Sequence, residues 1–176
     1  MHIVLESPRL FLRRFTASDE DAGLLLQLNS DPEVLQYLHE PLLQDLEHAH
    51  EVLAKILLPQ YELNLGRWAM HLKDDGRFIG WCGLKSRPER LEIDLGYRLH
   101  KQFWGRGYAT EAAGASLEHG FEILALSRIV GRAHVHNTAS ANVLKKVGMK
   151  YLRDEILDGN PVQTFEVHNH SPVHPF

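Results

Sequence analysis

The chain has 176 residues, of which 44% are hydrophobic and 24% charged, and its net charge is −4. This composition is typical of a globular protein with a hydrophobic core, and we expect residues 1–176 to form a single domain. The negative net charge gives no reason to expect a nucleic-acid partner. No apolar run approaches the ~20 residues that span a bilayer, so no membrane partner is predicted.

Cysteine content and the N-terminus indicate the compartment. Cys82 is the only cysteine, which excludes an intramolecular disulfide and a cysteine-based zinc site. The opening stretch MHIVLESPRLFLRRF lacks the apolar core and the small-residue cleavage site of a signal peptide. We therefore expect a cytoplasmic protein.

The first part of the chain predicts one strand and then helices. Side chains alternate between apolar and polar in residues 9–15, which indicates a strand. Ser18 precedes an acidic turn and is expected to cap a helix. The Asp-Pro-Glu sequence at 31–33 is typical of a second helix start, with proline at the first helical position. Apolar residues at helical spacing predict a third helix within residues 44–61.

The rest of the chain predicts a mixed sheet with two further helices. The predicted strands lie at 66–73, 77–85, 90–100, 127–135, 150–157 and 161–168, and the predicted helices at about 107–124 and 138–148. Asp-Asp-Gly at 74–76 and Asp158-Gly159 are hairpin turn signals. The resulting order, β-α-α-α-β-β-β-α-β-α-β-β, predicts an α/β fold with a mixed sheet flanked by helices.

A glycine-rich turn, Gln-Phe-Trp-Gly-Arg-Gly at 102–107, joins a predicted strand to a predicted helix. The first N–H groups of a helix have no intrahelical partner, and the helix dipole places positive charge there. Gly105 and Gly107 carry no Cβ that would keep a phosphate away from the backbone, and Arg106 adds a cation. The turn therefore predicts a phosphate site, the alternative being a plain strand-to-helix connection.

Two common phosphate-binding motifs do not fit this turn. A nucleoside-triphosphate loop would continue with Gly-Lys-Ser/Thr, whereas Gly107 is followed by Tyr108 and Ala109. A dinucleotide fingerprint would have a third glycine at position 110, which is threonine.

The turn instead resembles the Gln/Arg-x-x-Gly-x-Gly/Ala loop of the GCN5-related N-acetyltransferase (GNAT) superfamily. The run GYRLHKQFWGRGYATEA is similar to the branch that acetylates ribosomal-protein N-termini, as is the opening SPRLFLRRF. VHNTASANVLKKVGMK, residues 135–150, resembles that branch's Asn-x-x-Ser…Lys-x-Gly-Phe segment, with Met149 in place of phenylalanine. The resemblance implies the GNAT fold, a mostly antiparallel sheet that splays at an acetyl-CoA site.

The resemblance implies acetyl-CoA as co-substrate and assigns residues to it. The pantetheine arm would pair like an added strand with the backbone of Tyr97, Arg98 and Leu99, at an end of the strand that splays from its neighbour. Asn137 would bond to the same arm, its alternative role being a helix or turn cap. The residues expected to hold the diphosphate, through the matched loop and the N–H groups that follow, are Gln102, Gly105, Arg106, Gly107, Tyr108 and Ala109.

The chemistry of acetyl transfer favours a protein N-terminus as acceptor. The attacking amine must be neutral, and lysine, with a pKa of ~10.4, is neutral in only about one molecule per thousand near pH 7.4. An α-amine, with a pKa of ~7.7–8.0, is already roughly a quarter neutral and needs only a weak base. The open alternatives are a small-molecule amine (a polyamine, an amino sugar or an amino acid) and a non-catalytic domain that binds acyl-CoA.

Catalytic candidates follow from the resemblance. Ser140 lies where the branch places the proton donor to the leaving thiolate, and no tyrosine follows Asn137 before Tyr151. Glu155 lies where the branch holds a water with a glutamate, and Glu92, which shares one face of a strand with Asp94, is the rival base. The alternative role of Ser140 is a polar residue in the first turn of a helix, and that of Glu155 is a surface acid. For Glu92 and Asp94 the alternatives are a charged sheet face or attraction of a cationic substrate.

Three further expectations concern the oxyanion donor, metal binding and the oligomeric state. By family analogy, the N–H of Leu99 is the candidate donor to the oxyanion. His134 and His136 on one strand, and His168, His170 and His174 near the C-terminus, could bind metal, but no further ligand accompanies either set at a recognisable spacing, so no metal is predicted. Related enzymes often dimerise, and a homodimer is expected on that basis.

Overall fold

The computed structural model describes residues 1–169. An eight-stranded sheet runs through these residues in the order β1-β2-β3-β4-β5-β6-β8-β7. All neighbouring strands are antiparallel except β5 and β6, which are parallel, so the predicted mixed sheet is confirmed. The strands are β1 (Ile3–Glu6), β2 (Leu10–Arg13), β3 (Gly66–Leu72), β4 (Phe78–Arg87), β5 (Glu92–Leu99), β6 (Arg128–His134), β7 (Lys150–Leu157) and β8 (Asn160–His168).

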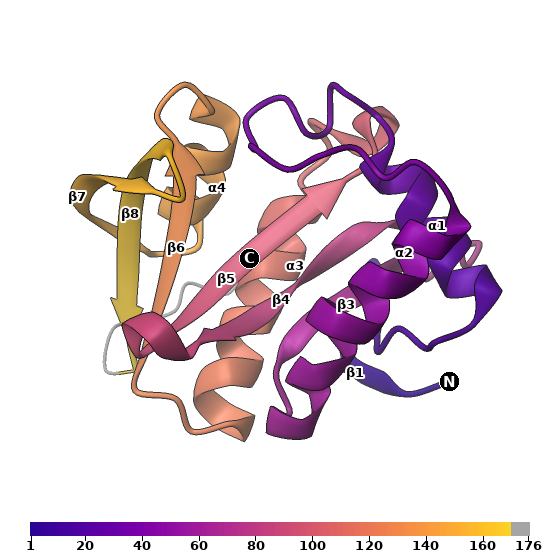
Figure 1. Ribbon diagram of the computed structural model, residues 1–176. Coiled ribbons are helices and arrows are strands. Elements are labelled where there is room, and N and C mark those ends of the chain that lie inside the picture. Colours follow the sequence, from indigo (N-terminus) through magenta and orange to yellow (C-terminus); the bar gives the residue numbers. More distant parts are fainter. Residues whose placement is uncertain (170–176) are drawn as a thin grey trace.

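Helices flank the sheet on both faces (Figure 1). Helices α1 and α2 lie in front of the β3 side of the sheet, and α3 and α4 lie behind it. The four helices are α1 (Asp19–Asn29), α2 (Leu46–Val52), α3 (Tyr108–Glu118) and α4 (Thr138–Lys146). Helix α2 continues as a π turn (Leu53–Leu57) and a 3-10 turn (Leu58–Leu63), and α3 as a π turn (His119–Ile123). Within the described range, no helix has the length and apolarity needed to cross a membrane.

Small side chains let α3 lie close to the sheet. Ala112, Ala113 and Ser116 are fully buried in this helix, which packs on β4 and β5. On the sheet side, Cys82 and Leu95 belong to the same core cluster. Close packing at this point fixes the position of the helix relative to β4 and β5, and therefore the position of its N-terminus.

The local signals of the sequence are confirmed at caps and turns. The Ser18 hydroxyl accepts a hydrogen bond from the N–H of Asp21 at 3.2 Å, which caps α1. Asp158 and Gly159 adopt φ angles of 50° and 79°, the left-handed pair that a two-residue hairpin turn between β7 and β8 requires. Gly148, with a φ of 90°, ends α4.

Two expectations were wrong near the N-terminus. Residues Ile3–Glu6 form β1, which the sequence did not reveal because its apolar run does not alternate. Residues 31–33 do not start a helix: the Glu33 N–H bonds to the Asp31 side chain at 2.9 Å, and the segment that follows is a series of turns.

The helix expected to start at residues 31–33 does not form because this segment contacts residues far along the chain. The Tyr37 ring lies 5.5 Å from the His134 ring of β6, and Glu40 forms an ion pair with Arg98 of β5 at 3.0 Å. These contacts draw residues 31–45 across the end of the sheet between β5 and β6 (Figure 1). Pro41 also disfavours a helical conformation at Glu40.

Candidate functional site

Strands β5 and β6 part halfway along their length. They pair only at Asp94 with Val130 and at Leu95 with Gly131, although β5 runs on to Leu99. Beyond these pairs the two strands diverge, and a gap opens toward the upper edge of the sheet in Figure 1. The splay that the resemblance implied is therefore present.

Beyond Leu95, one backbone edge of β5 has no strand partner among the described residues. The N–H of His100 donates to the carbonyl of Ile79 of β4 at 3.0 Å, which shows which residues of β5 point their backbone groups toward β4. Since such pairing alternates, the backbone groups of Arg98 face β4, and those of Tyr97 and Leu99 face the gap. The Leu99 carbonyl accepts a bond from the Trp104 indole at 3.0 Å. The remaining groups can pair with an extended chain that carries amides.

The glycine turn, residues 102–109, lies at the end of the gap and begins α3. Gly105 and Gly107 adopt φ angles of 73° and 80°, which other residues rarely reach, and both are exposed. No described residue accepts a hydrogen bond from the N–H groups of residues 105–110, the first intrahelical bond being that of Glu111 to the Gly107 carbonyl. A Cβ added at Gly105 would meet nothing within 4 Å, so the space outside the turn is open. The turn has the geometry of an anion site at a helix N-terminus.

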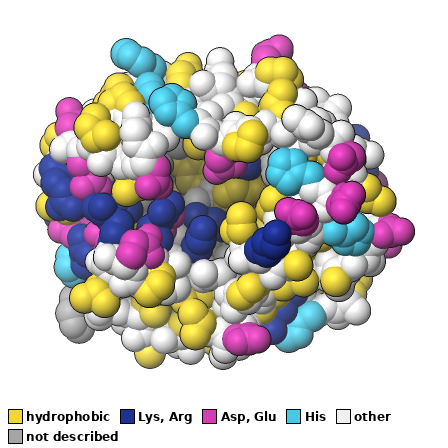
Figure 2. Space-filling model, in the orientation of Figure 1, with side chains coloured by type: hydrophobic (Ala, Val, Ile, Leu, Met, Phe, Trp, Pro, Cys, Tyr) yellow, Lys and Arg dark blue, Asp and Glu magenta, His cyan; other side chains and the backbone are white. Residues whose placement is uncertain are grey.

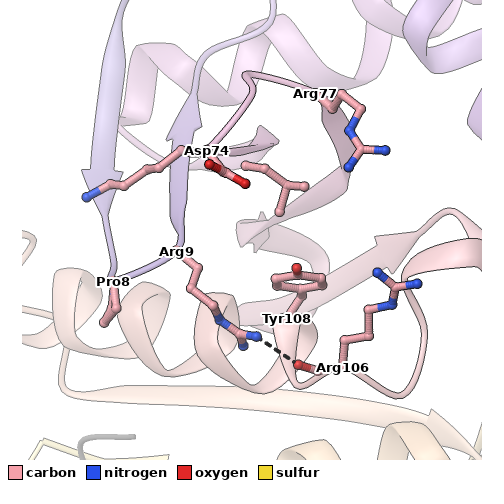
Figure 3. A pocket seen from close by; sticks show the side chains of 8 residues that line it. Pro8, Arg9, Asp74, Arg77, Arg106 and Tyr108 are labelled. Atoms are coloured by element: carbon pink, nitrogen blue, oxygen red, sulfur yellow. Dashed lines mark hydrogen bonds between the residues drawn. The ribbon is translucent and has the colours of Figure 1, made fainter.

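Beside this turn lies a cavity of about 630 Å³ that contains several cations. Its lining includes Arg9, which precedes β2, Lys73 and Arg77 from the β3–β4 hairpin, and Arg106 from the turn (Figure 3). Only Arg106 was predicted, because the other three are distant in the sequence and no motif joins them. The cavity adds positive charge beside the glycine turn.

Arg9 ties the N-terminal strands to the turn. Its guanidinium lies 4.4 Å from the centre of the Tyr108 ring, and it donates to the Arg106 carbonyl at 3.0 Å, the dashed line in Figure 3. It also forms an ion pair with the buried Glu111 at 2.6 Å. These contacts hold the turn in one conformation.

The start of α4 brings three candidate residues together behind the gap. The Asn137 side chain accepts from the N–H of Ser140 at 3.1 Å and so caps the helix, which was its alternative role. The Tyr97 hydroxyl donates to the Ser140 carbonyl at 2.7 Å and lies 3.1 Å from the Ser140 hydroxyl. Burial raises the pKa of Tyr97, and the bond with Ser140 lowers it less, so the phenol stays protonated. The sequence search for a tyrosine after Asn137 missed this one, because β5 supplies it.

The two carboxylate candidates share one arginine. Arg132, whose side chain is only 6% exposed, donates to Glu92 at 2.7 Å and to Glu155 at 2.8 Å. Glu155 also accepts from Arg90, Arg153 and Thr164. Burial raises its pKa, but the bonds from Thr164, Arg132 and Arg153 outweigh burial and bring it to about 2.

The same surroundings affect Glu92. Burial raises its pKa, but the bonds from Arg132 and Arg90 lower it below the ordinary value. Both carboxylates are therefore strongly held anions. This arrangement favours a structural role for them over proton transfer.

The histidine candidates that the structure describes form no metal site. Among residues 1–169, no group of three or more histidine, cysteine or acidic side chains could hold a metal ion. His134 and His136 lie close, with ring centres 5.4 Å apart, whereas His170 and His174 lie outside the described residues. Cys82 is buried, which raises its pKa to about 11 and makes it a poor nucleophile.

A family model and a related sequence both identify the same family for this chain. Residues 9–150 match the family described as an acetyltransferase (GNAT) domain. An uncharacterised N-acetyltransferase of Bacillus licheniformis, p20, is 31% identical over 147 residues, which are 83% of this chain and 82% of that protein.

Solved structures agree in fold and differ in acceptor. A ribosomal-protein-S5-alanine acetyltransferase of Vibrio fischeri superposes with a TM-score of 0.76 and 17% identity, over 94% of this chain and 96% of the other. A spermidine N-acetyltransferase of Vibrio cholerae, solved with CoA and spermine, has a TM-score of 0.75 and 17% identity, over 92% and 96% of the two chains. At these identities the likeness shows the fold alone.

Proposed function

Because the chain belongs to the acetyltransferase (GNAT) domain family, we propose that it transfers an acetyl group from acetyl-coenzyme A to a protein N-terminal α-amine. The enzyme is an N-acetyltransferase, and acetyl-CoA is its co-substrate. The acceptor is our inference. The observation that carries the proposal is the combination of a splayed strand pair with unpartnered N–H groups at the start of α3.

The residues of the gap and the glycine turn fit this co-substrate. The N–H groups of residues 105–110, together with Arg106 and the cations of the neighbouring cavity, are suited to a diphosphate. The backbone of Tyr97 and Leu99 is suited to the amides of the pantetheine arm. Acetyl-CoA supplies the activated acetyl thioester, and the Leu99 N–H is our candidate donor to its carbonyl oxygen.

In this proposal Ser140 provides the proton that the leaving sulfur needs. Its hydroxyl lies at the start of α4, where Asn137 caps the helix and fixes the first turn. Tyr97 is a positioning residue, because its hydroxyl donates to the Ser140 carbonyl and lies within hydrogen-bond distance of the Ser140 hydroxyl. Asn137 keeps the same turn in place and, as the resemblance implies, contacts the arm of the co-substrate.

The state of the carboxylates supports an α-amine as acceptor. Moving a proton from an ammonium of pKa ~8 to a carboxyl whose pKa is about 2, as in Glu155, would cost about 8 kcal/mol. A lysine acceptor would raise that cost further. An α-amine is already partly neutral near pH 7.4, so Glu92 and Glu155 need only organise their arginines and neighbouring water.

The test is release of free coenzyme A thiol from acetyl-CoA with a panel of amines. We expect turnover with peptides that have a free α-amine, and no turnover with the same peptides blocked at the N-terminus. Ser140→Ala should lower kcat by about 10²-fold or more, within the range of general acid catalysis, and leave binding of CoA unchanged in calorimetry. Thr138→Ala, at an exposed neighbouring position of α4, is the matched control. Turnover with lysine side chains or polyamines but not with α-amines would refute the proposed acceptor.

A further inference from the structure

The face of the sheet opposite α3 carries a set of charged side chains beside the gap. In β5, alternation places Asp94, Gly96 and Arg98 on this face, and Tyr97 on the other. We call the set the charged face. Its eight cations are Arg67, Lys85, Arg87, Arg90, Arg98, Arg128, Arg132 and Arg153, and its five carboxylates are Glu40, Glu92, Asp94, Glu155 and Glu166.

The charged face is therefore positive, although the whole chain has a net charge of −4. Figure 2 looks at this face and shows Lys and Arg side chains, in dark blue, from its left edge to a hollow near the middle. Acidic side chains lie among them. The positive charge is thus next to the opening where an acceptor amine would approach the gap.

Arg67 is built into the floor at the point where β5 and β6 part. Gly96 follows the last paired residue of β5, and a Cβ there would lie 2.7 Å from the Arg67 guanidinium carbon. The absence of a side chain at Gly96 therefore makes room for the arginine. Its guanidinium donates to the carbonyls of Gly83 and Asp94, both at 2.8 Å, and to the Asp94 carboxylate at 3.0 Å. This cation has a fixed position.

Lys85 is a cation that the described carboxylates compensate only at a distance. It lies directly across β4–β5 pairing from Asp94 and is half-buried, yet it makes no ion pair within residues 1–169. The Asp94 carboxylate is already shared by Arg67 and Arg87, at 3.0 and 3.1 Å. Burial first, and then the neighbouring Arg67 and Arg87, lower the pKa of Lys85, and they outweigh the opposite effect of the Asp94 and Glu40 carboxylates. An ammonium in such surroundings is stabilised by an incoming anion.

We propose that Lys85 and Arg67 bind a carboxylate of the acceptor, so that the preferred substrates are amines that carry a negative charge close to the amine. This inference rests on the proposed function, since it names the acceptor class of the same site. The fitting acceptor is a protein N-terminus with acidic side chains at its first positions. A free acidic amino acid presents the same chemistry. A polyamine, which offers only positive charge, is repelled by this face.

The experiment compares matched acceptors in the thiol-release assay. The acceptors are three hexapeptides with N-terminal alanine, followed by Asp-Glu, Asn-Gln or Lys-Lys, together with glutamate, glutamine and spermidine. We expect kcat/KM for the Asp-Glu peptide to exceed that for the Asn-Gln peptide about 10-fold at low salt, and the ratio to shrink at about 0.5 M NaCl. Glutamate turning over faster than the Asp-Glu peptide would identify a free amino acid as the source of the carboxylate.

Variants of Lys85 provide the decisive comparison. Lys85→Met should lower kcat/KM for the Asp-Glu peptide about 10-fold and leave the Asn-Gln peptide unchanged, whereas Lys85→Arg should keep the preference. Lys146→Met, at an exposed position of α4, is the control and should alter neither rate. Equal rates for acidic and neutral peptides, or a preference for spermidine, would overturn the inference.

Binding measurements separate this inference from the proposed function. Calorimetry in the presence of CoA should show tighter binding of the Asp-Glu peptide than of the Asn-Gln peptide, and Lys85→Met should remove the difference. That result without any turnover would support the charged face and sink the proposed transfer. Turnover of α-amine peptides with no charge preference would support the proposed transfer and refute the role of the charged face.

Discussion

Replacing Glu155 by glutamine should destabilise the sheet at neutral pH and leave the chemical step largely intact. Glu155 of β7 accepts bonds from Arg132 of β6, Thr164 of β8 and Arg90, which follows β4. It therefore links three strands and the turn before β5. Glutamine keeps the size of the side chain but removes the charge that its arginines face.

The magnitude follows from the pKa of the carboxyl. Glu155 has a pKa of about 2 in the folded protein, against an ordinary value of 4.5. Its side chain is 16% exposed, so solvent screening is limited, and the shift corresponds to about 3 kcal/mol of stability at pH 7. Because the folded-state pKa is lowered, this stability is fully present above pH 4.5 and is lost as the pH falls from 4.5 toward 2.

The assay is urea unfolding of both proteins at several pH values between 7 and 2.5. We expect Glu155→Gln to be less stable by about 3 kcal/mol at pH 7 and the difference to close below pH 4.5. Glu51→Gln is the control, since its exposed pair with Lys55 contributes less than about 1 kcal/mol. Equal stability of the two proteins at pH 7, with a large fall in kcat for Glu155→Gln, would refute the structural role and make Glu155 a catalytic group.

Three further outcomes are expected. Tyr97→Phe should lower kcat about 10-fold with little change in KM. The double variant Tyr97→Phe with Ser140→Ala should be no slower than Ser140→Ala alone, since both residues act on one proton; additive losses would show that the two residues act independently. Gly96→Ala should lower stability by about 1–3 kcal/mol in urea unfolding, because its Cβ meets the Arg67 guanidinium; unchanged stability would show that the arginine moves freely. Gly107→Ala should lower stability by about 1 kcal/mol and weaken CoA binding in calorimetry, because its φ is 80°; unaltered binding would exclude the turn as the diphosphate site.

Local sequence signals predicted most of the fold because the physics behind them is local. Hairpin turns, alternating strands and the Ser18 cap each depend on a few neighbouring residues, and each is found near its predicted place. The segment 31–45 failed for the opposite reason. Its conformation depends on Tyr37 contacting His134 of β6, 97 residues further along the chain, and on Glu40 contacting Arg98 of β5, 58 residues further along. No local pattern contains that information.

The candidate site likewise has a part that local sequence signals predicted and a part that depends on contacts between distant residues. The glycine turn was visible, because a helix start and two glycines occupy adjacent positions. The partners of Glu155 were not, because Arg132 meets it only through the strand order β6-β8-β7. Tyr97 was assigned to the site through its backbone, whereas its hydroxyl is what reaches Ser140. Residue types and spacing could predict the glycine turn, but the partners of Glu155 and the contact of the Tyr97 hydroxyl required the topology.

The register of β5 links the gap to the charged face. Successive side chains of a strand point to opposite faces of the sheet, so Tyr97 points toward α4 while Asp94 and Gly96 lie on the charged face. A slip of one residue would exchange these sets, bringing a charge toward Ser140 and removing the space that Arg67 occupies. The antiparallel ladder with β4 and two parallel pairs with β6 fix this register. On our proposal, the short parallel contact is therefore a compromise: it is long enough to hold the strand in phase, and short enough to leave Tyr97 and Leu99 free for the co-substrate.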